Sequence, residues 1–363
     1  MLGIEKSSNR IFGLDILRVV AIFFVVHGHG AFLLHGTKLE PLSHFLFFYE
    51  VDIFFVLTGF LIGSSFIHYG ERNGNVDRCK VLRFYGRSAL RILPCYYVML
   101  FVNYLFVHYQ WIPGNTTAFP LWQFITLTQN VFTPFYDFYW ESWCLPIQWW
   151  FYIFFPAFLL LLTPKFRIKR VIPFLCVLFV TLPILYRIGV SHHAQDSFWW
   201  SVWIRKTVAS RMDNVFFGVG AAWISYYFPV QWRKHALAGL LVGVTVLLLI
   251  SVFPRHIGSF YNNVLVSSIA PVAIALCLPF FSQLKTYRSW IGKVITDTSV
   301  LSFAMYLTNL LICQVIVAHF SDKFQQWGSE GYLLYWLLVM GTSYVLHIAI
   351  EKPFMKTRAR IQK

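Results

Sequence analysis

The first apolar segment of the chain carries four side chains able to take part in acid–base or ionic chemistry: Asp15, Arg18, His27 and His29. On a helix that turns about 100° per residue, Arg18 and His29 lie roughly 20° apart, and Asp15 lies roughly 40° from His29. These three side chains therefore share one stripe, whereas His27 points to the other side. Ionisable groups inside a long apolar helix are costly, which makes the stripe a candidate functional site.

Arg18 and His29 are separated by roughly 16 Å along the helix axis. They cannot touch without a bridging molecule or a kink in the helix. We therefore expect a long molecule to lie between them. Gly28 and Gly30 remove side chains beside His29, which lets a substrate or a neighbouring helix approach the imidazole. The structural alternative is an Asp15–Arg18 pair that holds helix packing, with His29 as a hydrogen-bonded core residue.

A second candidate group consists of Arg83, Arg87 and Arg91 in the segment RFYGRSALRILP. Their spacing of four places them on one helical face, just before an apolar span. Guanidinium groups bind phosphate in a bidentate manner, so this basic ridge suits a phosphorylated donor such as a nucleotide or coenzyme A. The alternative is ordinary anchoring against anionic lipid.

The segment VDIFFVLTGFLIG follows Glu50 and contains Asp52. Its small residues, from Thr58 to Gly63, predict a surface for tight helix contact. A buried Asp52 needs a donor, which Arg18 or a backbone amide is expected to supply.

The elements that position these residues are apolar helices. Of the 363 residues, 58% are hydrophobic and only 12% are charged, which is far from the composition of a soluble domain. Long continuous apolar runs in lipid must be helices, because their backbone groups are then bonded internally. We expect an all-α, polytopic integral membrane protein of about ten spans, forming a single domain over residues 1–363. The expected spans are 12–34, 46–68, 92–108, 145–163, 171–189, 208–228, 236–253, 261–282, 297–320 and 331–350.

Lys and Arg gather in alternate loops, which predicts that those loops and both termini are cytoplasmic. The formal charge of +15 then reflects topology and contact with membrane lipids rather than binding of nucleic acid. The longest external segment runs from about 109 to 142 and is rich in tryptophan. The six scattered cysteines lack the paired spacing of a metal or disulfide framework, so we expect them to pack.

Seven blocks in order resemble the acyltransferase-3 family of bacterial membrane O-acyltransferases, in a stand-alone form without a fused extracytoplasmic domain. GLDILRVVAIFFVVHGH is similar to the family's opening helix, whose Arg-(ten residues)-His motif falls on Arg18 and His29. FYGRSALRILP resembles its Arg-x-x-x-Arg-Ile-x-Pro segment, at Arg87 and Arg91. The other blocks are VDIFFVLTGFLIG, TLTQN, RMDNVFFGVGAA, SFAMYLTNLLI and IEKPF.

The resemblance implies an O-acyltransferase of the bacterial cytoplasmic membrane that moves an acyl group, in our expectation acetyl, from acyl-coenzyme A to a sugar hydroxyl. No permanently bound cofactor is expected, since acyl-coenzyme A is a co-substrate. Its phosphates would lie at Arg87 and Arg91. His29 would act as general base or as transient acyl carrier. Asp15 and Arg18 would position the site or stabilise oxyanion charge.

Two positions depart from the family pattern. In SWCLPIQWWFY, which ends at Tyr152, Gln148 stands where an acidic residue is expected, and Cys144 replaces a serine. Asn309 in YLTN replaces a histidine. Gln148 and Asn309 are therefore candidate site residues whose amides orient groups but take no proton at neutral pH.

Two other classes of function remain open at this point. A transporter or flippase would use Asp15, Arg18 and Asp52 as an ion-coupled relay. A non-catalytic partner descended from an enzyme would bind coenzyme A without turnover.

Overall fold

The computed structural model describes residues 10–44, 49–117, 120–133, 137–252, 259–284 and 289–360, apart from the side chains of 358–360. Within these ranges the regular structure is helical, with no strand. The helices and their bounds are α1 (Phe12–Gly30), η1 (Ala31–Leu34), α2 (Glu40–Ser43), α3 (Glu50–Asn73), α4 (Arg78–His108), α5 (Leu121–Thr126), η2 (Trp140–Trp143), α6 (Cys144–Leu162), α7 (Ile168–Val190), η3 (Ser191–His193), α8 (Ser197–Trp200), η4 (Ser201–Arg205), α9 (Val208–Tyr227), α10 (Pro229–Lys234), α11 (Ala236–Val252), η5 (Tyr261–Leu265), α12 (Val266–Phe281), α13 (Trp290–His319), α14 (Ser321–Trp327), α15 (Ser329–Leu346), η6 (His347–Glu351) and α16 (Lys352–Arg360).

Eight helical segments in the described part of the chain are long and apolar enough to cross a membrane. They lie within 12–34, 50–73, 78–108, 140–162, 168–193, 261–281, 290–319 and 329–357. The expected spans 208–228 and 236–253 correspond to α9 and α11, which are not among the eight. The chain is thus all-helical and membrane-integral, while the number of about ten spans and the cytoplasmic termini stay predictions.

Several expected boundaries are wrong, because hydropathy marks where the apolar stretch begins rather than where the helix begins. Helix α4 starts at Arg78 instead of 92, α13 starts at Trp290 instead of 297, and the last helical segment continues to Arg360 instead of 350. The second span ends at Asn73 rather than 68, and the expected residues 46–48 and 253 lie outside the described ranges. The basic ridge is therefore part of the continuous helix α4 and does not precede it.

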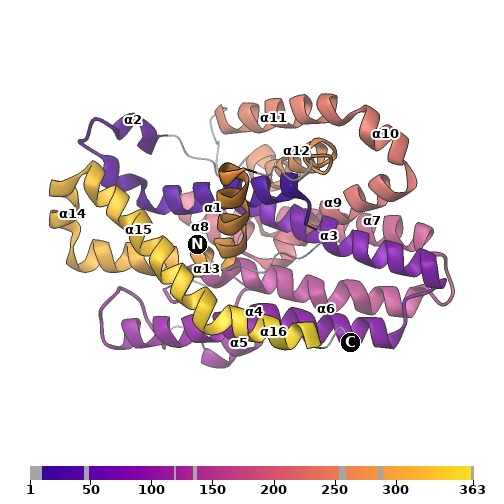
Figure 1. The fold of residues 1–363 in the computed structure, drawn as a ribbon, viewed down its shortest axis with the longest axis horizontal. Helices are drawn as coiled ribbons and strands as arrows, with labels where there is room; N and C mark the ends of the chain where they lie inside the picture. The colour runs from indigo at the N-terminus through magenta and orange to yellow at the C-terminus, as the bar shows by residue number, and fades with distance from the viewer. Residues whose placement is uncertain are drawn as a thin grey trace.

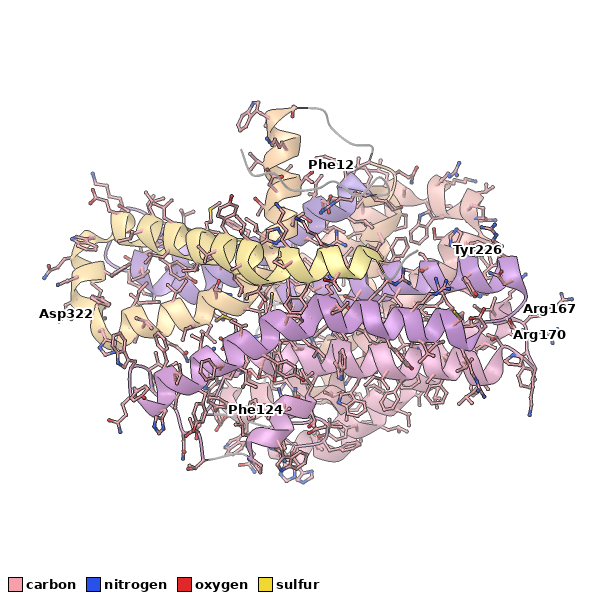
Figure 2. The ribbon with its side chains drawn as sticks, turned by 60° about the horizontal axis from the view of Figure 1, so that its bottom comes forward. Phe12, Phe124, Arg167, Arg170, Tyr226 and Asp322 are labelled. Atoms are coloured by element: carbon pink, nitrogen blue, oxygen red, sulfur yellow. The ribbon has the colours of Figure 1, made fainter. Side chains whose placement is uncertain are left out.

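The long helices α1, α3, α4 and α6 run roughly along the long axis of the molecule (Figure 1). Arg167 and Arg170 lie at one end of this axis and Asp322 lies at the other (Figure 2). Helix α3 packs against α9, while α13 packs against both α1 and α15. The candidate residues on α1 therefore face neighbours that come from both halves of the sequence.

The small-residue surface on α3 makes the close helix contact that the sequence predicts. A Cβ atom on Gly59 would lie 1.9 Å from the backbone oxygen of Val215, and one on Gly218 would lie 2.0 Å from the oxygen of Val56. Both glycines are needed because the backbones of α3 and α9 approach each other too closely for any side chain.

Candidate active site

His29 lies at the end of α1 and forms a hydrogen bond between its Nδ1 and Oδ1 of Asn309 on α13. The amide of Asn309 is oriented by its own bonds, since Nδ2 donates to the backbone oxygens of Met305 and Tyr306, each at 2.8 Å. Its oxygen must then face the imidazole, so Nδ1 of His29 carries the hydrogen. Nε2 is left as the basic nitrogen, which is the state that a general base requires.

A cavity of about 310 Å³ opens beside His29. Its polar lining comes from the start of α3, from η2, and from η4 with the residue that follows it. Glu50, Glu141, Arg205 and Lys206 contribute charges. We call it the His29 cavity. Trp140, Trp143 and Tyr306 supply aromatic walls.

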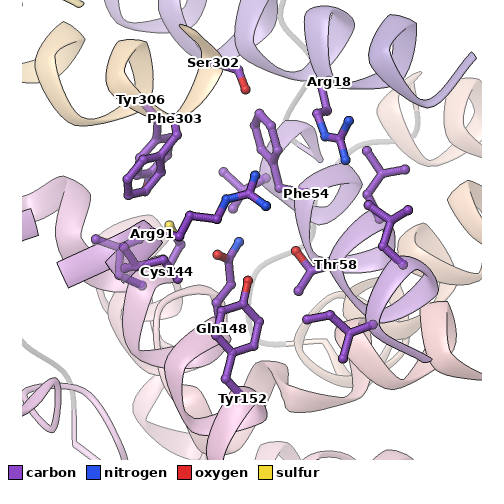
Figure 3. Close-up of a pocket in the computed structure, with 16 residues that line it drawn as sticks. Arg18, Phe54, Thr58, Arg91, Cys144, Gln148, Tyr152, Ser302, Phe303 and Tyr306 are labelled. Carbon is purple, nitrogen blue, oxygen red and sulfur yellow. The ribbon is translucent and has the colours of Figure 1, made fainter. Parts of the chain in front are cut away.

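A second cavity, of about 130 Å³, lies along Arg18 and is called the Arg18 cavity. Arg18 and Arg91 reach into it from α1 and α4, and Gln148 and Tyr152 line it from α6 (Figure 3). It is lined elsewhere by apolar side chains and the hydroxyls of Thr58 and Ser302. Two cations above neutral polar groups make an anion-binding pocket with room for an acyl chain.

Val51 and Tyr306 line both cavities, so the two spaces are neighbours with a common wall. Tyr306 is held in place because its hydroxyl donates to the backbone oxygen of Glu141 at 2.7 Å. Arg18 belongs to one cavity and His29 to the other, as their separation along α1 requires. Arg18 and His29 thus face adjacent cavities on either side of the wall that Val51 and Tyr306 form.

Asp15 orients Arg18 and does not line either cavity. Its carboxylate accepts from Arg18 at 2.8 Å, from Arg10 at 2.7 and 3.0 Å and from Ser299 at 2.8 Å. Arg18 uses one nitrogen for this pair, so its remaining donors stay available to the cavity. Asp15 is therefore a positioning residue.

The three arginines of the basic ridge have different surroundings. Arg91 lines the Arg18 cavity, but Arg83 and Arg87 do not. Nε of Arg87 donates to the backbone oxygen of Arg83 at 3.2 Å. Arg91 and Arg18 thus line the same cavity, whereas Arg83 and Arg87 lie on α4 outside it.

Asp52 is buried, but the expected donors are wrong. Its carboxylate pairs with Arg211 and accepts from Asn214 at 2.9 Å, both on α9, whereas Arg18 is engaged with Asp15. Helix α9 supplies the donors because the glycine contact brings it against α3. Asp52 thereby fixes helix packing next to the site.

His27 is a packing residue, since its two ring nitrogens contact the hydroxyl of Tyr332 at 2.8 Å and the backbone oxygen of Leu42 at 3.0 Å. Gly30 admits the ring of Tyr335, so the neighbour that approaches there is helix α15. Helix α15 thus covers α1 at His27 and Gly30, whereas His29 lines the His29 cavity.

Sequence reasoning missed Glu141, Arg205, Lys206 and Tyr306, which line the His29 cavity. Three of them lie in segments that were read as loops or span ends, where charge is ordinary. Two signals could have found members of this set: Glu141 lies between two tryptophans in WESW, and Tyr306 lies in the block SFAMYLTNLLI.

The apolar helices and the two adjacent polar cavities between them define a polytopic membrane protein with a candidate site inside its bundle. The chain belongs to the acyltransferase-3 family, because the family model described as "Acyltransferase domain" matches residues 11–352. This confirms the resemblance carried by the seven blocks.

Curated relatives include two provisionally named O-acetyltransferases of Staphylococcus aureus, from strains COL and MSSA476. Each is 24% identical to this chain in an alignment that covers 97% of this chain. The chain spans 58% of the length of these relatives. No solved structure matches the chain.

Proposed function

We propose that the protein is a membrane O-acyltransferase that moves an acyl group, acetyl in the first instance, from acyl-coenzyme A to a carbohydrate hydroxyl. The observation that carries the proposal is the placement of His29, whose Nδ1 is bonded to Asn309 and which lines a cavity that adjoins the Arg18 cavity. Family membership supports the reaction class. The names of the curated relatives support acetyl and oxygen as the transferred group and the acceptor atom.

The donor would enter from the cytoplasm at the basic end of the bundle. Arg91 and Arg18 would hold phosphate oxygens or the thioester carbonyl, with the pantetheine arm extended along α1. Gln148 and Tyr152 would contribute neutral hydrogen bonds to that arm. Arg87 and Arg83, farther along α4, would meet the nucleotide end.

In the chemical step, the acceptor hydroxyl attacks the thioester carbonyl as Nε2 of His29 takes its proton. The tetrahedral oxyanion is stabilised by a nearby cation, and collapse breaks the carbon–sulfur bond. The proton then passes from His29 to the departing sulfur. The products are the O-acyl sugar and free coenzyme A, and no cofactor is consumed.

The orientation of His29 leaves the Nε2 lone pair able to serve either as general base or as transient acyl carrier, and we propose the general-base role. Asn309 holds Nδ1–H, so the basic Nε2 is directed where an acceptor proton would be removed. His29 would itself be the base, so the family's histidine at the position of Asn309 is not needed as one. The amide of Asn309 is sufficient to orient the imidazole of His29. The acceptor would be a cell-surface or lipid-linked glycan at the cytoplasmic membrane of the bacterium.

The test is transfer of label from radiolabelled acetyl-coenzyme A into host glycans, in membranes that contain the wild type or single variants. We expect His29→Ala to lower the rate by about 10²- to 10⁴-fold, the usual contribution of a general base. Arg91→Ala should raise the KM for acetyl-coenzyme A about tenfold, because a charge-assisted hydrogen bond is lost. His35→Ala and Arg170→Ala, both on exposed side chains, are the matched controls. Label that enters glycan equally with His29→Ala would contradict the proposal.

A further inference from the structure

The proposed reaction forms an oxyanion, and a cation must lie close to the place where it forms. That place is where the acceptor hydroxyl, next to Nε2 of His29, attacks the thioester carbonyl, and it therefore belongs to the His29 cavity. Arg18 lies roughly 16 Å from His29 along α1 and lines the other cavity, beyond the wall that Val51 and Tyr306 form. Arg18 is thus placed for a phosphate of the donor rather than for a carbonyl under attack beside His29.

Arg205 and Lys206 are the basic side chains that line the His29 cavity. Nη2 of Arg205 donates to Oε1 of Glu50 at 2.8 Å, so a direct pair neutralises the charge of Arg205. Lys206 has no such pair among the described residues. Glu141 lines the same cavity, but neither of its carboxyl oxygens has a hydrogen-bond partner in the described part of the chain. The ammonium group of Lys206 is therefore the cation of this cavity that is placed to bind an incoming oxygen.

Both ends of Lys206 are held in place. Nδ2 of the buried Asn130, in the block TLTQN, donates to the backbone oxygen of Lys206 and, at 2.8 Å, to that of Trp143. The backbone N–H of Val208 donates to the backbone oxygen of Asn130 at 2.8 Å. Nζ of Lys206 lies 4.2 Å from the centroid of the Trp140 ring, and this cation–π contact keeps the ammonium group at the cavity wall. Lys206 is thus preorganised, as electrostatic stabilisation of a transition state requires.

We propose that the ammonium group of Lys206 binds the carbonyl oxygen of the thioester and stabilises its negative charge during transfer. This inference rests on the proposed function and adds to it a residue outside the seven blocks. When the acceptor oxygen bonds to the carbonyl carbon, the electron pair of the carbonyl double bond moves to the oxygen beside Nζ. Collapse restores the double bond and breaks the carbon–sulfur bond. His29 passes its proton to the sulfur, and Lys206 keeps its own proton throughout.

Lys206 can perform this role only while it is protonated. Burial, followed by the charge of Arg205, lowers its pKa to about 7, and the charge of Glu141 opposes this shift. The other titratable groups of the lining come from α1, α3 and α13 and are His29, Glu50 and Tyr306. With this pKa the protonated fraction of Lys206 falls from about one half at pH 7 to about 1% at pH 9, so the rate of transfer should fall with it.

The experiment measures transfer of label from acetyl-coenzyme A into host glycans, in membranes that contain the full chain, between pH 6 and pH 9. The concentration of acetyl-coenzyme A is varied to separate kcat from KM, and rates are divided by the amount of folded protein. We expect kcat of the wild type to fall about 10- to 50-fold between pH 7 and pH 9. Lys206→Met should lower kcat at pH 7 by about 10²- to 10³-fold, the usual loss for one oxyanion donor, while the KM for acetyl-coenzyme A stays within about threefold.

Lys206→Arg is the conservative variant, because a guanidinium group stays protonated over this pH range. It should keep at least about a tenth of the wild-type kcat at pH 7, and its kcat should change less than about threefold between pH 7 and pH 9. Lys323→Met, on an exposed side chain of α14, is the matched control and should equal the wild type. The melting temperature of Lys206→Met should not fall at pH 7, whereas a purely structural role of Lys206 would lower stability and activity together.

Three outcomes overturn the inference while transfer still depends on His29. The first is a kcat of Lys206→Met within about threefold of the wild type, well short of the loss of an oxyanion donor. The second is a Lys206→Arg variant that is no more active than Lys206→Met, and the third is a Lys206→Arg variant whose kcat falls as steeply with pH as that of the wild type. Failure of the proposed function has a different signature. In that case transfer into glycan is equal in the wild type and in His29→Ala, and the inference on Lys206 falls with it.

Discussion

Substitution of Asn309 by alanine tests the orientation of the candidate base without removing it. Asn309→Ala deletes the oxygen that accepts from Nδ1 of His29, but both helices keep their backbone bonds. The imidazole can then place its hydrogen on either nitrogen, and only one of these tautomers leaves Nε2 basic. A net hydrogen bond of about 1 to 1.5 kcal/mol corresponds to a loss of about 5- to 13-fold in kcat.

The assay is steady-state transfer of label from acetyl-coenzyme A, with the amount of folded protein measured by size-exclusion chromatography. Asn262→Ala is the matched control, because Asn262 is also a buried asparagine but lines neither cavity. We expect its kcat to equal that of the wild type. Two results would refute the reasoning: wild-type kcat in Asn309→Ala, or a loss as large as that of His29→Ala in protein that remains folded.

Three further predictions concern stability in detergent, followed by thermal melting. Gly59→Leu should destabilise the fold by about 1–3 kcal/mol or more, because its Cβ meets the backbone of Val215. Gly86→Ala is the control and should be neutral or stabilising, since the space around Gly86 is open. Equal melting temperatures for the two variants would contradict this prediction. Asp77→Ala should cost about 1 kcal/mol, because the carboxylate caps α4. A hydrogen bond from Tyr69 holds the pKa of Asp77 below its usual value. The wild type should therefore lose the stability that this carboxylate contributes as the pH falls through the lowered pKa. A stability difference between wild type and Asp77→Ala that is the same at pH 7 and pH 3 would count against the cap. Lys206→Met should stabilise the fold most at or below pH 7 and progressively less towards pH 10. Burial lowers the pKa of Lys206 to about 7, so between these pH values the unfolded chain binds more protons than the folded one. A stability difference between variant and wild type that does not change with pH would argue against the buried charge.

Much of the architecture follows from local properties of the chain. A continuous run such as FGLDILRVVAIFFVV can satisfy its backbone only as a helix in lipid, so its helical state needs no knowledge of neighbours. The same holds for the shared stripe of Arg18 and His29, because helical periodicity is a property of one segment. The small surface from Thr58 to Gly63 predicted a close contact, but not that α9 would make it.

Helix ends are harder to predict than helix positions, because hydropathy and the continuation of backbone hydrogen bonds are different properties of the chain. Hydropathy reports the depth of the apolar layer, whereas a helix continues wherever its backbone bonds continue. Helix α4 therefore begins at Arg78, capped by Asp77, although its apolar stretch starts near 92. Pro94 lies inside the helix without ending it.

The sequence by itself determined that this is an all-helical membrane chain with Arg18 and His29 on one face, and its motif blocks resemble those of the acyltransferase-3 family. Only the tertiary structure decided what surrounds them: Asn309 beside His29, Arg91 across from Arg18, and Glu141 and Lys206 in the His29 cavity. The partners of Asp52 were also decided by the tertiary structure, since Arg211 lies 159 positions away in the chain. The physical reason is that hydrogen bonding and charge pairing depend on distances of a few ångströms between segments, and packing sets those distances rather than the spacing of residues within any one helix.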